Sequence, residues 1–163
     1  TAYSSIQAAL DANPGRMVFV PAGDYVIEKK IQIRGENAGL FGPGRIIQSN
    51  TDQPIIEVEH AKGAQLRDLI LTRAEGKIDT DREGILAIDC RDLAIENVRV
   101  VDNRTRSGAI ALRDSRNSRV SRCLVRNYMR VTIDDRTKSA DWGYAFNCTD
   151  GTGISVAYCT GGM

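Results

Sequence analysis

The chain has 163 residues, of which 42% are hydrophobic and 26% are charged, values that are ordinary for one globular domain. It contains no run of about 18 apolar residues that could span a membrane, and its first residues lack the basic and apolar regions of a signal peptide. A net charge of +1 and only 6% aromatic residues argue against nucleic acid as a partner.

Residues 4–13 are predicted to form a short helix. Ile6, Leu10 and the alanines between them make one apolar stripe at helical spacing. A serine at position 4 or 5 can cap the start, and Asn13-Pro14-Gly15 ends the helix. No other segment of the chain predicts a helix.

The rest of the sequence consists of short runs rich in β-branched residues, separated by turn residues, a pattern typical of a sandwich, a barrel or a solenoid. These runs are 17–20, 25–27, 31–33, 46–47, 55–58, 66–71, 85–88, 93–95 and 98–101.

Internal repetition favours the solenoid. Three segments, beginning at Gly84, Gly108 and Gly143, each read as glycine, strand, turn, strand, turn, strand. The first spacing is 24 residues and the second is 35, so we expect 11 extra residues to form a loop within 129–142. A coil of three short strands predicts an all-β right-handed parallel β-helix, because stacked coils bury a shared core that one coil cannot bury alone.

The alignment predicts which side chains stack inside. One inward row should contain Leu66, Ile95, Val120 and Val156, and a second should contain Leu69, Val98, Cys123 and Cys159. Stacking leaves the Cβ vectors of Cys123 and Cys159 parallel, which strains a disulfide, so free thiols are expected. Cys90 and Cys148 should lie two coils apart, too far to pair.

The helix at 4–13 should cover the first coil, because an open end exposes strand edges and apolar core. The chain is therefore predicted to be one domain, residues 1–163, with its coils in 17–163. The last strand has no matching cap, so the sequence is expected to continue beyond Met163 or to meet a partner chain there.

Two segments carry a family resemblance. Residues 5–12, followed by Val18-Phe-Val-Pro-Ala-Gly-Asp-Tyr-Val-Ile27, and later Ile88-Asp-Cys-Arg-Asp-Leu-Ala-Ile-Glu-Asn-Val98, resemble the pectate lyase superfamily of right-handed β-helix proteins. The resemblance implies the fold and a secreted, periplasmic or cell-surface location. It implies no single reaction, since members include polysaccharide lyases, glycoside hydrolases, epimerases and phage tailspikes.

One branch of that superfamily is disfavoured. Polygalacturonases carry Asn-Thr-Asp, Gly-Asp-Asp and Gly-His-Gly motifs, whereas the matching stretches here are Arg82-Glu83-Gly84 and Arg106-Ser107-Gly108. No histidine follows His60, which also disfavours the histidine-dependent uronan epimerases within this segment.

Arginines are concentrated in one part of the sequence. Residues 91–136 contain 11 arginines, no lysine and 6 acids. Such residues either line solvated turns and strands or form a binding face for anions, because the planar guanidinium pairs at two points with a carboxylate.

The candidate site lies where the turns before successive first strands should gather along one edge, walled by the loop insertion. The predicted catalytic residues are Asp81, Glu83, Asp134, Asp135 and Asp141. The predicted substrate-binding residues are Arg104, Arg106, Arg136, Lys138, Trp142 and Tyr144. Paired carboxylates suit glycoside hydrolysis, whereas cations with a base suit lyase chemistry on acidic sugars, and the acids could also hold calcium.

Other interpretations of the same residues stay open. The acids and arginine at 134–136 are also typical of a solvated loop, and Trp142 could plug the core instead of binding sugar. His60 is expected at the surface, and Asp89, Asp114 and Asp150 are expected to make hydrogen bonds at one turn. The sequence thus predicts a carbohydrate-active enzyme that cleaves an acidic polysaccharide, or alternatively a non-catalytic, glycan-binding tailspike or adhesin segment, which could be trimeric.

Overall fold

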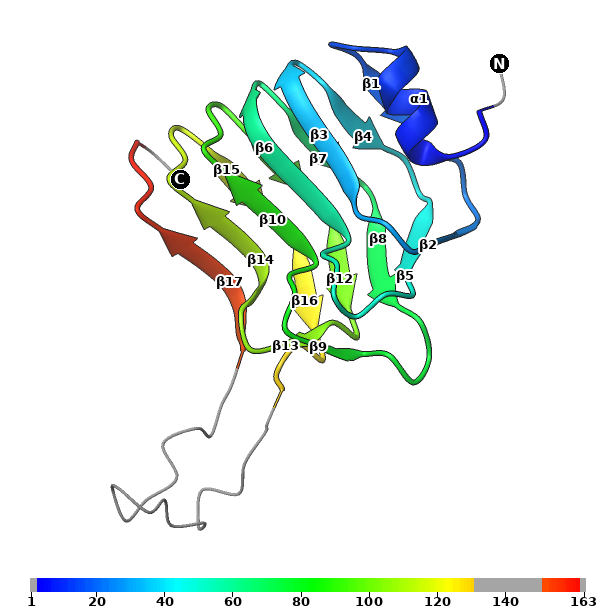
Figure 1. Ribbon diagram of the computed structural model, residues 1–163. Coiled ribbons are helices and arrows are strands. Elements are labelled where there is room, and N and C mark those ends of the chain that lie inside the picture. The colour runs from blue at the N-terminus through cyan, green and yellow to red at the C-terminus, as the bar shows by residue number, and fades with distance from the viewer. Residues whose placement is uncertain (1–2, 131–150, 162–163) are drawn as a thin grey trace.

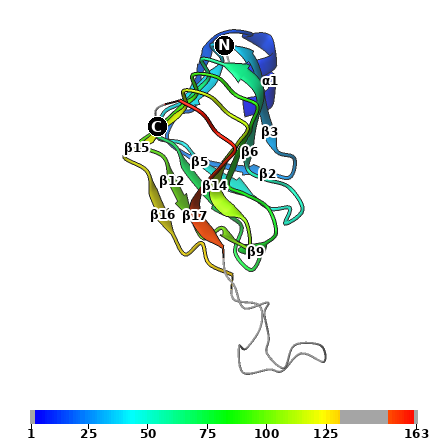
Figure 2. The same cartoon turned by 90° about the vertical axis from the view of Figure 1, so that its left-hand side faces the viewer.

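The computed structural model describes residues 3–130 and 151–161, and these form a parallel β-helix. The chain passes through three five-stranded parallel sheets in a repeating order. Figure 1 shows the coils side by side, with helix α1 (Ile6–Ala12) at one end of the stack and strand β17 (Thr152–Ala157) at the other. Figure 2 shows the coils behind one another. The predicted all-β parallel β-helix with a short N-terminal helix is confirmed.

The sheets are named here A, B and C. Sheet A contains β1 (Met17–Phe19), β4 (Gly39–Phe41), β7 (Gln65–Arg67), β11 (Ala94–Glu96) and β15 (Arg119–Ser121). Sheet B contains β2 (Asp24–Ile27), β5 (Arg45–Gln48), β8 (Ile70–Arg73), β12 (Arg99–Val101) and β16 (Leu124–Arg126). Sheet C contains β3 (Ile31–Glu36), β6 (Ile56–Lys62), β10 (Ile85–Ile88), β14 (Gly108–Arg113) and β17. Strands β9 (Asp79–Thr80) and β13 (Arg104–Thr105) form a separate pair.

Inward side chains stack in rows because successive coils pair in register. In sheet A, Leu40, Leu66 and Ile95 are each 0% exposed, and Val120 continues their row. At the corner between sheets A and B, backbone hydrogen bonds place Leu69, Val98 and Cys123 in neighbouring coils. These rows confirm the stacking predicted for the first three members of each set.

The fourth member of each predicted row was wrong. Val156 pairs with Leu112 of β14, so it lies in sheet C and not above Val120. Cys159 precedes Thr160, which bridges Arg116, so it lies beside Ser115 and not beside Cys123. The cause is the length of the last interval. Ile85 pairs with Ile110, 25 residues later, whereas Ile110 pairs with Ile154, 44 residues later.

Several asparagines and aspartates at the corners have left-handed backbone conformations. Asp68 and Asn97 have φ angles of 62° and 52°, and the side-chain amide of Asn97 donates to Asp68 over 2.7 Å. Asp89 and Asp114, at another corner, have φ angles of 49° and 51°, but the Asp89 carboxylate contacts His60 of the neighbouring coil instead of making the predicted hydrogen bond in its own turn. Asx side chains tolerate this conformation better than most others, so they suit sharp corners that repeat in every coil. Asp150 lies outside the described residues.

Helix α1 caps the first coil as predicted. The Oγ of Ser5 accepts from the backbone N–H of Ala8 over 3.0 Å, and Ile6 and Leu10 join the core. Gln7 accepts from the N–H of Gln32 and donates to its carbonyl, at 2.8 and 3.2 Å, so it satisfies the free edge of β3. Among the described residues no helix is long and apolar enough to cross a membrane.

The described cysteines, Cys90, Cys123 and Cys159, are free thiols, and Cys148 lies outside the described residues. Burial raises the pKa of the Cys90 and Cys123 thiols. Both therefore stay protonated at neutral pH and act as small core residues.

Candidate functional site

The predicted edge is formed by the paired strands β9 and β13. Arg104 lies opposite Asp79, with a guanidinium nitrogen 3.3 Å from the carboxylate. Asp81 is approached by Arg106 at 3.8 Å and by Arg130 at 2.8 Å. The structure therefore brings Asp81, Arg104 and Arg106 to one edge, where the exposed Asp81 carboxylate is shared by two arginines.

Glu83 lies on the same edge but is buried. Its side chain is 6% exposed, and Oε1 accepts from the Ser107 hydroxyl at 2.8 Å and from Arg113 at 2.9 Å. Arg113 belongs to the far end of β14, so its side chain runs back along the outer face of sheet C. The ion pair with Glu83 therefore holds the Arg113 side chain in place along the outer face of sheet C.

The other predicted site residues lie outside the described residues. These are Asp134, Asp135, Arg136, Lys138, Asp141, Trp142 and Tyr144. Their roles remain predictions.

The arginine-rich stretch does not form one face, contrary to the sharper interpretation of the sequence. Arg113 lies on sheet C, Arg119 on sheet A, Arg126 on sheet B and Arg104 on the β9–β13 edge. Neighbours in sequence are carried to different sides because each coil turns the chain through all three sheets. In the described part of the chain, cations of different coils come together where equivalent positions stack.

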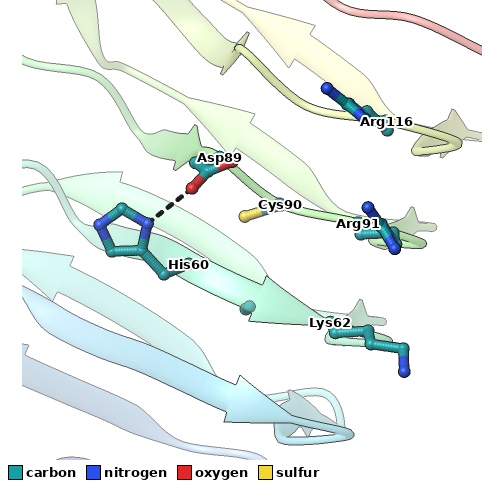
Figure 3. Close-up of a pocket in the computed structure, with 7 residues that line it drawn as sticks. His60, Lys62, Asp89, Cys90, Arg91 and Arg116 are labelled. Atoms are coloured by element: carbon teal, nitrogen blue, oxygen red, sulfur yellow. Dashed lines mark hydrogen bonds and ion pairs between the residues drawn. The ribbon is translucent and has the colours of Figure 1, made fainter.

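Such a stack stands at the corner between sheets C and A, and we call it the cation ladder: Lys62, Arg91 and Arg116. Their backbones bridge in register from one coil to the next. They line a hollow of about 380 Å³ together with His60, Asp89 and Cys90. In Figure 3 the ladder stands on one side of the hollow, with His60 and Asp89 on the other.

The ladder carries uncompensated positive charge. Lys62 lies 3.6 Å from Glu36, and both side chains are well exposed, so this ion pair is weak. Within the described ranges, Arg91 and Arg116 have no carboxylate at ion-pair distance. The hollow can therefore accept an anion without first breaking a strong contact.

His60 is oriented by one carboxylate and has a second one nearby. Its Nδ1 lies 2.8 Å from Oδ2 of Asp89 in the next coil, and its Nε2 lies 3.7 Å from Oε1 of Glu59. The imidazole is 64% exposed, in agreement with the predicted surface position. An imidazole oriented by a carboxylate is suited to proton transfer, provided that its second nitrogen can reach a substrate.

Sequence reasoning missed this grouping. The signal was a four-residue corner that repeats as His60-Ala-Lys-Gly63, Asp89-Cys-Arg-Asp92 and Asp114-Ser-Arg-Asn117. The alignment of the glycine-led segments begins at Gly84, so it does not include the preceding coil, which contains His60.

No group of three or more His, Cys, Asp or Glu side chains that could hold a metal ion occurs in residues 3–130 and 151–161. The calcium site suggested by the sequence has no ligand set in this part of the chain.

Fold and site together define a parallel β-helix protein with a basic corner. No known protein family and no curated protein matches the sequence. A solved structure of similar fold is that of a provisionally assigned glycosyl hydrolase from Parabacteroides merdae ATCC 43184. It has a TM-score of 0.50 and 14% identity, over 89% of this chain and 80% of that chain. Likeness at this identity shows the fold, and membership of the pectate lyase superfamily stays a prediction.

Proposed function

We propose that this β-helix binds an acidic polysaccharide along the cation ladder. The observation that carries the proposal is the repetition of Lys62, Arg91 and Arg116 at one position of successive coils. Paired strands lie about 4.8 Å apart, so the ladder presents cations at a regular short interval. A chain of uronic acids presents carboxylates at regular intervals, and arginine is well suited to bind them. The fold shared with a provisionally assigned glycosyl hydrolase supports a saccharide as the ligand.

The test is a charge reversal at the ladder. The double variant Arg91→Glu/Arg116→Glu is expected to bind polygalacturonate at least about tenfold more weakly at low salt, measured by isothermal titration calorimetry. The matched control is Arg99→Glu/Arg126→Glu, which makes the same change in net charge on sheet B. An equal loss in both variants would show that only the overall charge matters, and would reject the ladder as the site.

The pair formed by His60 and Asp89 extends the proposal to cleavage by β-elimination. With the uronate carboxylate held by the ladder, Nε2 of His60 would take the C5 proton. The C4–O bond breaks, a C4–C5 double bond forms, and the departing oxygen takes a proton from water. The cations stabilise the negative charge that develops beside the carboxylate in this step.

Elimination is measured as new ultraviolet absorbance from unsaturated ends. We expect polygalacturonate or another uronan to produce it, and His60→Ala to slow it at least about a hundredfold, since general bases contribute factors of this size. Full activity in His60→Ala would remove His60 from the reaction. Absence of both this absorbance and new reducing ends with every uronan would leave a non-catalytic binding module.

Hydrolysis at the β9–β13 edge is the second candidate. It rests on the acids of this edge, Asp81 near Arg106 and Glu83 beside Arg113, with Asp134, Asp135 and Asp141 as the further acids proposed from the sequence. New reducing ends without ultraviolet absorbance would favour this edge over His60.

A further inference from the structure

The outer face of sheet A carries one continuous row of side chains from successive coils. Strand register places its members in line: Phe19, Phe41, Arg67, Glu96 and Ser121. The alternate residues point into the core, so these five side chains face outward. We call them the sheet A row. It lies on a different face from the β9–β13 edge and from His60.

Three arginines surround the single carboxylate of this row. Glu96 lies 2.5 Å from Arg122, 3.6 Å from Arg119 and 4.0 Å from Arg67. The carboxylate is 20% exposed, whereas the arginines are 48% to 73% exposed. One carboxylate cannot neutralise three guanidiniums, so the cluster holds an excess of two positive charges. Most of their donors face solvent.

The other end of the row is aromatic. The rings of Phe19 and Phe41 are 5.2 Å apart, and Phe19 is 54% exposed. The two rings are tilted by 46° to each other, so the exposed face of Phe19 is the apolar surface on which the C–H face of a sugar ring can pack. Ser121 ends the row at the opposite edge of the sheet, and its hydroxyl oxygen is buried, so it adds nothing to the exposed surface.

We infer that the sheet A row is a second saccharide site, which binds an anionic glycan lying across the strands. A sugar ring would pack on Phe19 and Phe41, while a carboxylate or sulfate further along the chain would bridge Arg119 and Arg122 beside Glu96. Charge complementarity selects an anionic ligand, and the in-line aromatic pair selects a saccharide over an acidic peptide. The inference does not depend on the proposed role of the cation ladder.

The experiment uses the Arg91→Glu/Arg116→Glu chain as background, so that binding at the ladder is already weakened. Polygalacturonate and dextran sulfate serve as carboxylate and sulfate probes, and affinity is measured by calorimetry. Adding Arg119→Glu/Arg122→Glu is expected to weaken the remaining binding at least about fivefold, and Phe19→Ala about threefold. Adding Arg99→Glu/Arg126→Glu on sheet B should change it less than twofold. Circular dichroism checks that each variant is folded.

The outcomes separate the two sites. If the ladder variant binds like the unmodified chain while the sheet A variants lose affinity, the proposed ladder fails and the sheet A site stands. If the background has no residual binding, or the sheet A and sheet B reversals act alike, the sheet A site is rejected. Equal binding of polyglutamate, unaffected by Phe19→Ala, would make the ligand an acidic peptide and reject the saccharide. The probe that binds more tightly shows whether the anionic group of the ligand is a carboxylate or a sulfate.

Discussion

Replacing Leu66 by alanine is expected to lower the free energy of unfolding by about 2–5 kcal/mol. Leu66 is 0% exposed and stacks between Leu40 and Ile95, its partners in the neighbouring coils. The short strands on either side cannot collapse inward, because each is fixed by hydrogen bonds to the coils above and below. The cavity should therefore stay open, and the loss should lie in the upper part of this range. Urea unfolding followed by circular dichroism measures it.

Leu86→Ala is the matched control. Leu86 belongs to β10 but alternates with the buried Ile85 and Ala87, so its side chain lies on the outer face of sheet C. The same loss of atoms there should cost only about 1 kcal/mol. Similar losses for Leu66 and Leu86 would contradict the assignment of inward and outward rows.

Replacing Arg73 by alanine is expected to have an effect of similar size, about 3 kcal/mol or more, because several buried acceptors lose their donor. Arg73 is 3% exposed, and its guanidinium donates to the carbonyls of Asn50 and Gln53, at 3.0 and 2.9 Å, and to the amide oxygen of Asn103, at 2.6 Å. Burial lowers the pKa of Arg73 to about 10, so the side chain is still charged at neutral pH.

Arg82→Ala gives the comparison for Arg73, because Arg82 is an exposed arginine of a neighbouring turn. It should change stability by no more than about 0.5 kcal/mol. Arg73 also donates to the carbonyl of Glu83 at 3.4 Å, so its loss should loosen the β9–β13 edge. A small effect of Arg73→Ala on urea unfolding would show that water can replace the guanidinium at this corner.

Much of the fold could be predicted because apolar residues recur at equivalent positions of successive coils. Leu66, Ile95 and Val120 occupy equivalent places, and the strand register confirms them. The last coil could not be placed in the same way. Gly143 looks like the start of a coil, but glycine does not set the register. For example, the N–H of Gly84 donates to the carbonyl of Ala109, and not to that of Gly108, so the two glycines do not mark equivalent positions. The register is set by the corner residues, which after β17 are Tyr158-Cys-Thr-Gly161.

The candidate site was less accessible to sequence reasoning because its contacts join residues of different coils. His60 and Asp89 are 29 positions apart, yet they touch because one coil separates them. Glu96 likewise meets Arg67 and Arg122 from the coils on either side. The grouping of Asp81 with Arg106 could be anticipated, because both precede the first strands of neighbouring coils. Composition indicated an excess of arginine, but only the winding decides which arginines stack.

Amide hydrogen exchange with and without saturating polygalacturonate would locate the bound chain most directly. Slower exchange is expected in the three stacked corner turns at 60–63, 89–92 and 114–117, which carry the cation ladder. Strands β5, β8 and β12 of sheet B should exchange at unchanged rates. Protection confined to sheet B, or no protection at any of the three turns, would contradict the proposed binding of an acidic polysaccharide at this corner.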